Sequence, residues 1–218
     1  MPASRICATP YPPLPDRIRA AREMFEQVMV LDPDFDGGYA GAAWTLSFDA
    51  MWSHEDAGAG VGRAMALAQQ AIKVDETFAW SHTALGFAFL NKLQHDKAMA
   101  ASAQAIALQP NDADAHAHHG LILGISGQHA QGIAAVERAI PLNPQFVYGP
   151  YLNIMAQIKL MAGDYQGSIT AFEENVSRQG PIGRPALCWP AAAYWALGQK
   201  DDAARMSAML SENSPNFV

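Results

Sequence analysis

The chain has 218 residues, of which 50% are hydrophobic and 16% are charged, and its formal net charge is -7. This composition excludes an intrinsically disordered chain, which combines low hydrophobicity with high charge. Because the charge is acidic and no dense run of Lys and Arg occurs, a nucleic-acid partner is excluded as well. Two cysteines, Cys7 and Cys188, are too few for a disulfide framework or a four-ligand zinc site.

Residues 1–15 contain five prolines and no apolar segment of the kind found in signal peptides, so we expect this segment to be irregular. No uninterrupted apolar stretch approaches the roughly 20 residues that a membrane-spanning helix needs, which predicts no membrane insertion. As written, the sequence favours a cytoplasmic protein. A leading helix is predicted over residues 16–31.

The central part of the chain repeats with a period of 34 residues, which separates Glu76 from Pro110 and Pro110 from Pro144. Small residues recur at fixed places, as Gly86 and Gly120 do in the first helix of two successive copies. Since glycine costs about 1 kcal/mol inside a helix, its recurrence indicates two helices in close contact. Copies of this two-helix unit are predicted to start near residues 36, 79, 113, 149 and 184.

This pattern resembles the tetratricopeptide repeat (TPR), in which W-x2-L-G-x2-Y and A-x3-F precede a proline. The resemblance implies an all-α, right-handed solenoid, with residues 16–218 forming a single domain whose concave surface is lined by the first helices. The segments 21–26, 31–33 and 39–45 are also similar to TPR regions of bacterial adenylate cyclase and transcriptional-activator signalling proteins. If the chain is a fragment of a membrane-anchored member of that group, a periplasmic location becomes the alternative.

The TPR resemblance also implies which residues line the groove, and the predicted set is largely aromatic and apolar: Trp44, Phe48, Trp80, Phe87, Leu90, Leu121 and Trp195. No motif of nucleotide, acyl-transfer or zinc chemistry is present. The sequence therefore predicts a non-enzymatic scaffold without cofactors, which binds an apolar protein or peptide segment. The alternative interpretation is that these aromatic side chains pack between neighbouring repeats.

Nine extra residues lie within positions 49–62, where Trp52 precedes a glycine-containing segment. Insertions in repeat proteins often serve binding, so Trp52 is a candidate contact residue of an insertion loop. The alternative is a lengthened helix with Trp52 folded over a neighbour.

Two further hypotheses concern other classes of function. The end of the solenoid lacks an obvious polar capping helix, which allows the chain to assemble into a homo-oligomer. His82, His116 and His119 are weak candidates for metal ligands, because His116 and His119 are three residues apart and His82 occupies the repeat position of His116. A metal-dependent hydrolase built on them is the least favoured alternative, and ordinary hydrogen-bonded histidines are the expected outcome.

Overall fold

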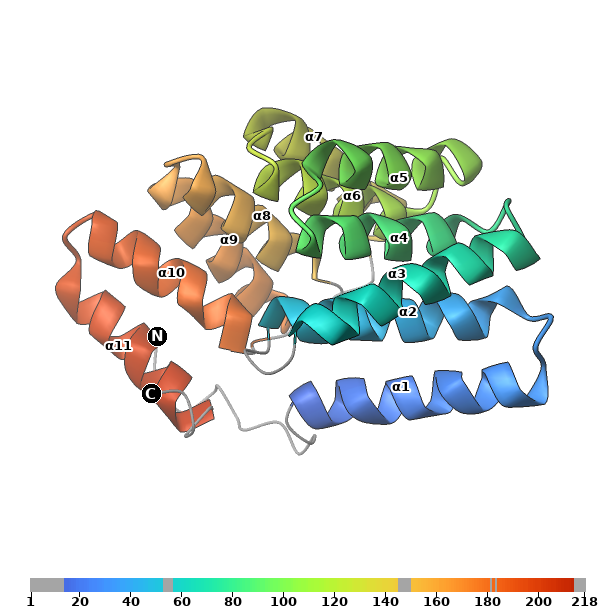
Figure 1. Cartoon of the computed structure of the whole chain (residues 1–218). Helices are drawn as coiled ribbons and strands as arrows, with labels where there is room; N and C mark the ends of the chain where they lie inside the picture. The colour runs from blue at the N-terminus through green and yellow to red at the C-terminus, as the bar shows by residue number, and fades with distance from the viewer. Residues whose placement is uncertain (1–13, 53–56, 145–149, 181, 183, 214–218) are drawn as a thin grey trace.

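The computed structural model describes residues 14–52, 57–144, 150–180, 182 and 184–213, and within these ranges it contains eleven α-helices and no strand. The helices lie side by side in a curved row that begins with α1 and ends with α10 and α11 (Figure 1). Their bounds, in chain order, are α1 Leu14–Leu31, α2 Asp36–Trp52, α3 Ala57–Val74, α4 Ala79–Asn91, α5 His95–Leu108, α6 Ala113–Ile125, α7 His129–Leu142, α8 Tyr151–Met161, α9 Tyr165–Ser177, α10 Arg184–Ala196 and α11 Lys200–Asn213. The predicted all-α solenoid is confirmed.

The helices form five antiparallel pairs, α2/α3, α4/α5, α6/α7, α8/α9 and α10/α11, with α1 preceding them. The first helix of each later pair packs on both helices of the pair before it. First helices are therefore enclosed, and second helices line the outside. Burial follows this arrangement, since ten of the 13 residues of α6 are buried but only three of the 14 residues of α7.

The predicted repeat starts at 36, 79, 113 and 184 coincide with the first residues of α2, α4, α6 and α10, whereas α8 begins at Tyr151. A capping side chain marks the start of α6. The Asp112 carboxylate accepts hydrogen bonds from the amides of Asp114 and Ala115, which satisfies two of the free N–H groups at the start of α6.

The close approach of paired helices explains the recurring glycines. A Cβ built on Gly86 would lie 3.3 Å from the carbonyl oxygen of Ala98 in α5. One built on Gly120 would lie 2.8 Å from the carbonyl oxygen of Gly132 in α7. The distance at Gly120 is too short for a Cβ next to a backbone atom, and the one at Gly86 is tighter than most Cβ contacts, so the absence of a Cβ favours the close approach of both pairs.

The extra residues of the first repeat lengthen its helices. With 17 and 18 residues, α2 and α3 are longer than α4 and α5, which have 13 and 14. Residues 57–62 form the start of α3, so the described part of the predicted insertion is helical. Trp52 is the last residue of α2, and its side chain and residues 53–56 lie outside the described residues.

The turn inside the second pair is strained at Leu93. Three other pairs place a glycine with positive φ at the turn, namely Gly127 at 85°, Gly163 at 81° and Gly198 at 76°, whereas α4/α5 has Leu93 at 56°. The side chain of Leu93 is 77% exposed, so it contributes little packing. Because glycine adopts this conformation without the penalty of a Cβ, the leucine weakens the turn.

We therefore expect Leu93→Gly to raise the free energy of unfolding by about 0.5–1 kcal/mol. Urea denaturation followed by circular dichroism at 222 nm measures the change. Leu93→Ala is the control, because it removes the exposed side chain but keeps the Cβ. Equal stability of the glycine and alanine variants would show that backbone conformation is not the cause.

Candidate partner-binding surface

Aromatic side chains of α2 meet one from the N-terminal turn of α4. Trp44 and Phe48 lie one turn apart on α2, and their rings stack with centroids 5.1 Å apart and an interplanar angle of 26°. Trp80 lies in the first turn of α4, and its ring centroid is 5.8 Å from that of Trp44. All three side chains are half-buried, so each has one part in the protein and another at the surface.

His118 of α6 joins these rings from the next repeat and is itself buried. Its imidazole meets the rings of Phe87 and Trp80 edge-on, with ring centroids 5.4 Å and 6.2 Å apart. The ring centroids of His118 and Trp44 are 6.3 Å apart. We call Trp44, Phe48, Trp80, Phe87 and His118 the aromatic cluster. It links three successive first helices, so its geometry depends on correct stacking of three repeats.

The environment of His118 disfavours its charged form. Burial lowers the pKa of His118 below the usual value, and the carboxylates of Asp114 and Asp112 oppose this effect. Asp114 accepts a 2.7 Å hydrogen bond from the hydroxyl of Tyr151 in α8. Burial and this hydrogen bond raise the pKa of Tyr151, so the hydroxyl stays protonated and continues to donate at neutral pH.

Several buried polar atoms at and beside the aromatic cluster have no hydrogen-bond partner among the described residues. They are Trp44 Nε1, His118 Nδ1 and the hydroxyl oxygens of Ser47 and Ser81. Because native proteins satisfy most buried polar groups, such a concentration is unusual. The cluster therefore combines apolar ring faces with hydrogen-bonding capacity that the described fold does not use.

The predicted groove residues do not form one surface. Phe87, Leu90 and Leu121 are buried in the main hydrophobic core, where the first helices of neighbouring repeats meet. These three are therefore packing residues, and their assignment to an open groove is corrected. The reason is that each first helix is covered on both sides, which closes the positions that a more open solenoid would expose.

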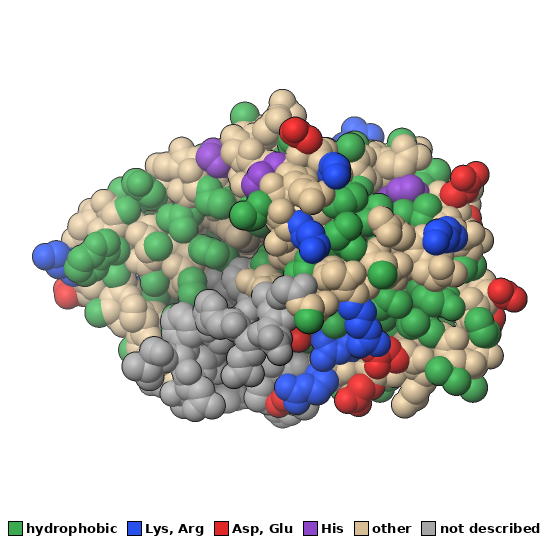
Figure 2. Space-filling view, in the orientation of Figure 1, with side chains coloured by type: hydrophobic (Ala, Val, Ile, Leu, Met, Phe, Trp, Pro, Cys, Tyr) green, Lys and Arg blue, Asp and Glu red, His purple; other side chains and the backbone are tan. Residues whose placement is uncertain are grey.

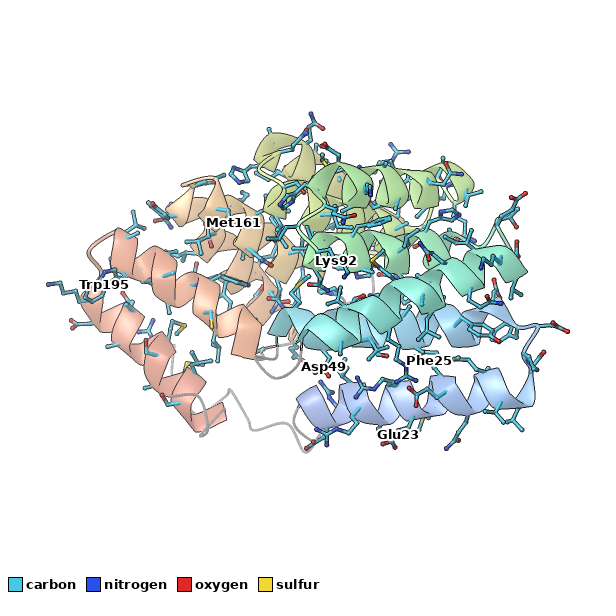
Figure 3. The ribbon with its side chains drawn as sticks, viewed as in Figure 1. Glu23, Phe25, Asp49, Lys92, Met161 and Trp195 are labelled. Atoms are coloured by element: carbon cyan, nitrogen blue, oxygen red, sulfur yellow. The ribbon has the colours of Figure 1, made fainter. Side chains whose placement is uncertain are left out.

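Trp195 lies apart from the others, at the C-terminal end of α10 and far from α2 in the row of helices (Figure 3). Its side chain is 66% exposed, and the ammonium nitrogen of Lys200 stands 5.9 Å from its ring centroid. A cation–π contact at such an exposed site contributes about 0.5–1 kcal/mol. Trp195 thus does not share a site with Trp44 and Trp80.

The candidate metal ligands point to different partners. His82 Nε2 lies 3.0 Å from the carbonyl oxygen of Glu76, and His116 Nε2 lies 2.9 Å from that of Pro110. His119 Nδ1 lies 2.8 Å from the hydroxyl of Ser102. No three side chains of His, Cys, Asp or Glu converge on a possible metal position in the part of the chain that the structure describes. The hydrolase alternative requires His82, His116 and His119 to converge on one metal ion, and in the structure their side chains do not converge.

His82 and His116 instead share a structural role. Each is 34 residues from the other, and each imidazole bonds the carbonyl group six residues earlier in the loop that precedes its helix. In both repeats, the histidine thus holds the loop that precedes the helix, before α4 and before α6. Their equivalence was visible in the sequence, but the loop carbonyl partner was not.

Sequence comparison gives no match, either to a family model or to a curated protein. Comparison of structures does give matches. The chain is similar to PilW, described as a widely conserved type IV pilus biogenesis factor, with 21% identity, a TM-score of 0.66 and coverage of 92% of this chain and 88% of that one. It is also similar to TTC0263, a thermophilic TPR protein in Thermus thermophilus, with 14% identity, a TM-score of 0.65 and coverage of 82% and 93%.

A third similar structure is YrrB, described as a TPR protein with an unusual peptide-binding site, with 17% identity, a TM-score of 0.52 and coverage of 90% and 95%. These likenesses agree with the 34-residue period and the stacked helix pairs. The chain has the tetratricopeptide-repeat fold. No helix of this TPR chain, within the described residues, is long and apolar enough to cross a bilayer.

Proposed function

We propose that this TPR chain is a non-enzymatic scaffold that binds an apolar segment of a partner protein against Trp44, Phe48 and Trp80. The observation that carries the proposal is the half-burial of these three side chains on two neighbouring first helices, with the ring of Trp44 in contact with the rings of both Phe48 and Trp80. Aromatic side chains supply much of the energy at protein interfaces, because they bury a large area at a small cost in conformational entropy. Neighbouring repeats hold these rings in place, which further reduces the ordering cost of binding.

Polar groups near the C-terminal ends of α2 and α4 would orient the partner. Asp49 follows Phe48 directly and forms an ion pair with Arg22 of α1, with Nη1 and Oδ2 3.3 Å apart. Lys92 lies just past the end of α4 and is exposed. A mixed polar border around an apolar centre is the usual composition of a protein interface. A role in bacterial signalling, and a periplasmic location as part of a membrane-anchored signalling protein, rest on the sequence resemblance alone.

A phage-displayed library of 16-residue peptides, selected against the full chain, tests this proposal. We expect enrichment of peptides with two or more large apolar residues, whose binding weakens at least tenfold in Trp80→Ala, or about 1.4 kcal/mol. Trp195→Ala is the matched control, since it removes an exposed tryptophan outside the aromatic cluster. Selected peptides that bind Trp80→Ala as tightly as wild type, or that lose binding only in Trp195→Ala, would refute the assignment.

A further inference from the structure

A carboxylate lies next to the aromatic cluster. Trp80 and Asp114 are the second residues of α4 and α6 and are 34 residues apart, so they occupy equivalent positions in successive repeats. His118 follows Asp114 by one turn on the same side of α6, and its imidazole meets the indole ring of Trp80 edge-on. Trp80 and Asp114 are both half-buried. An indole ring and a carboxylate are therefore neighbours at the surface where α4 packs on α6.

The carboxylate of Asp114 is held in place but is not neutralised. Its Oδ1 atom accepts the 2.7 Å hydrogen bond from the hydroxyl of Tyr151. Among the described residues, no group donates a hydrogen bond to Oδ2, and none of the ion pairs includes Asp114. One oxygen of a charged, oriented carboxylate therefore remains available to a ligand.

The helices that supply the aromatic cluster provide no cation for this carboxylate. Within their bounds, α2, α4 and α6 contain no Lys or Arg, and their acidic residues are Asp36, Asp49 and Asp114. Lys92 follows the end of α4 that is opposite to Trp80. At the α1 end of the molecule, by contrast, acidic and basic side chains lie beside one another (Figure 2), and Arg22 pairs there with Asp49. The negative charge beside the aromatic cluster is thus uncompensated.

His118 adds a polar group at this place without adding a charge. Its side chain is buried, and its Nδ1 atom has no hydrogen-bond partner among the described residues. Burial lowers the pKa of the imidazole, so the ring is neutral at pH 7 and does not repel a cation. Because native proteins satisfy most buried polar atoms, this one distinguishes the junction of Trp80 and Asp114 from ordinary acidic positions on the surface.

We propose that Trp80 and Asp114 bind an arginine side chain of the partner segment, whose guanidinium stacks on the indole ring and donates hydrogen bonds to the carboxylate. The assignment depends on the proposed function and names the chemistry of one partner residue. Arginine fits better than lysine, because its planar guanidinium stacks on aromatic rings and presents several N–H donors in a fixed geometry. Apolar residues beside the arginine would contact Trp44 and Phe48. Such a basic, apolar segment complements a chain with a net charge of -7.

Matched peptides with arginine or citrulline test this site. The peptides selected by phage display against the full chain are synthesised with arginine and again with citrulline, which has nearly the same shape but no charge. We expect the selected sequences to be enriched in arginine, and the citrulline forms to bind wild type at least tenfold more weakly by fluorescence anisotropy. Asp114→Asn, which can still accept the hydrogen bond from Tyr151, should bind the arginine forms at least tenfold more weakly than wild type does.

Asp201→Asn is the matched control, since it removes the same charge from the first turn of α11, outside the aromatic cluster. It should bind the arginine peptides as wild type does, and circular dichroism should show both aspartate variants to be folded. Replacing the arginine of the peptide with lysine should weaken binding to wild type at least threefold. The site is refuted if wild type binds the arginine form no more tightly than the citrulline or lysine form, or if both aspartate variants lose binding equally.

A smaller probe, Nα-acetylarginine methylamide, separates this site from the proposed function. The chain has five tryptophans, so its indole N–H signals in a ¹⁵N-labelled sample are few, and Trp80→Ala identifies the signal of Trp80. We expect the probe to shift this signal saturably, at least tenfold more weakly in Asp114→Asn, and the citrulline analogue to leave it unchanged. Peptides that depend on Trp80 but lack arginine, with no shift by the probe, would overturn the arginine site and leave the proposed function intact. The shift without any Trp80-dependent peptide would refute the proposed function instead.

Discussion

Replacing Gly132 with alanine is expected to lower the free energy of unfolding by roughly 2–3 kcal/mol, although alanine is the better helix former. A Cβ at this position would lie 2.7 Å from the carbonyl oxygen of Gly120 and 3.0 Å from the amide nitrogen of Gly124. These are backbone atoms and cannot rotate away. The helices α6 and α7 would therefore have to separate, which loosens the packing of the central pair.

Gly62→Ala is the matched control for this prediction. Gly62 lies in α3 on an exposed position, and no atom lies within 4 Å of the place where its Cβ would stand. The same chemical change should here raise stability by about 0.5–1 kcal/mol, because only the helix preference acts. Urea denaturation at pH 7.5 compares both variants with wild type. A shift of both midpoints in the same direction would contradict the close-contact explanation.

The recurrence of glycine and alanine also explains why the fold was predictable. A fixed 34-residue period demands that equivalent residues meet equivalent neighbours, so Gly86 and Gly120 indicate close helix pairs in the sequence alone. The starts of α2, α4, α6 and α10 followed from the same register. Local spacing was sufficient here, because each repeat contacts mainly its immediate neighbours.

The candidate site was less predictable, since exposure depends on how tightly the repeats stack. Phe87 and Leu121 occupy positions that line the groove in the family, but here neighbouring helices enclose them. His118 gave no repeat signal, because Ala84 stands at the same position one repeat earlier and Gly41 at that of the first repeat. Its role appears only when α2, α4 and α6 are placed together.

His118 makes the stability of this assembly depend on pH. Burial lowers the pKa of its imidazole, while Asp114 and Asp112 on the same helix partly compensate. From the other helices, α2 and α4 contribute aromatic rings, and α8 contributes the Tyr151 hydroxyl that bonds Asp114. In the unfolded chain the imidazole has its ordinary pKa of about 6.5. Below that pH the unfolded state binds more protons than the folded one.

The stabilisation is therefore complete above about pH 6.5 and is lost as the pH falls toward the lower pKa of the folded state. Because one group binds at most one proton, the loss cannot exceed about 1.4 kcal/mol per pH unit. His119, whose pKa is lowered first by burial and then by the charge of His116, adds to the same trend.

His118→Phe isolates the contribution of this one residue. The variant keeps an aromatic ring against Trp44, Trp80 and Phe87 but has no group that titrates. We expect the difference in unfolding free energy between variant and wild type to be constant from pH 8 to about 6.5, and then to increase in favour of the variant as the pH falls. Urea denaturation at half-unit steps from pH 8 to 5 measures this difference. Both proteins contain the same acidic groups and His119, so the contributions of these groups cancel in the comparison. Parallel curves over the whole range would mean that His118 accepts its proton equally well in the folded and unfolded chain, and that the rings around it do not exclude the charge.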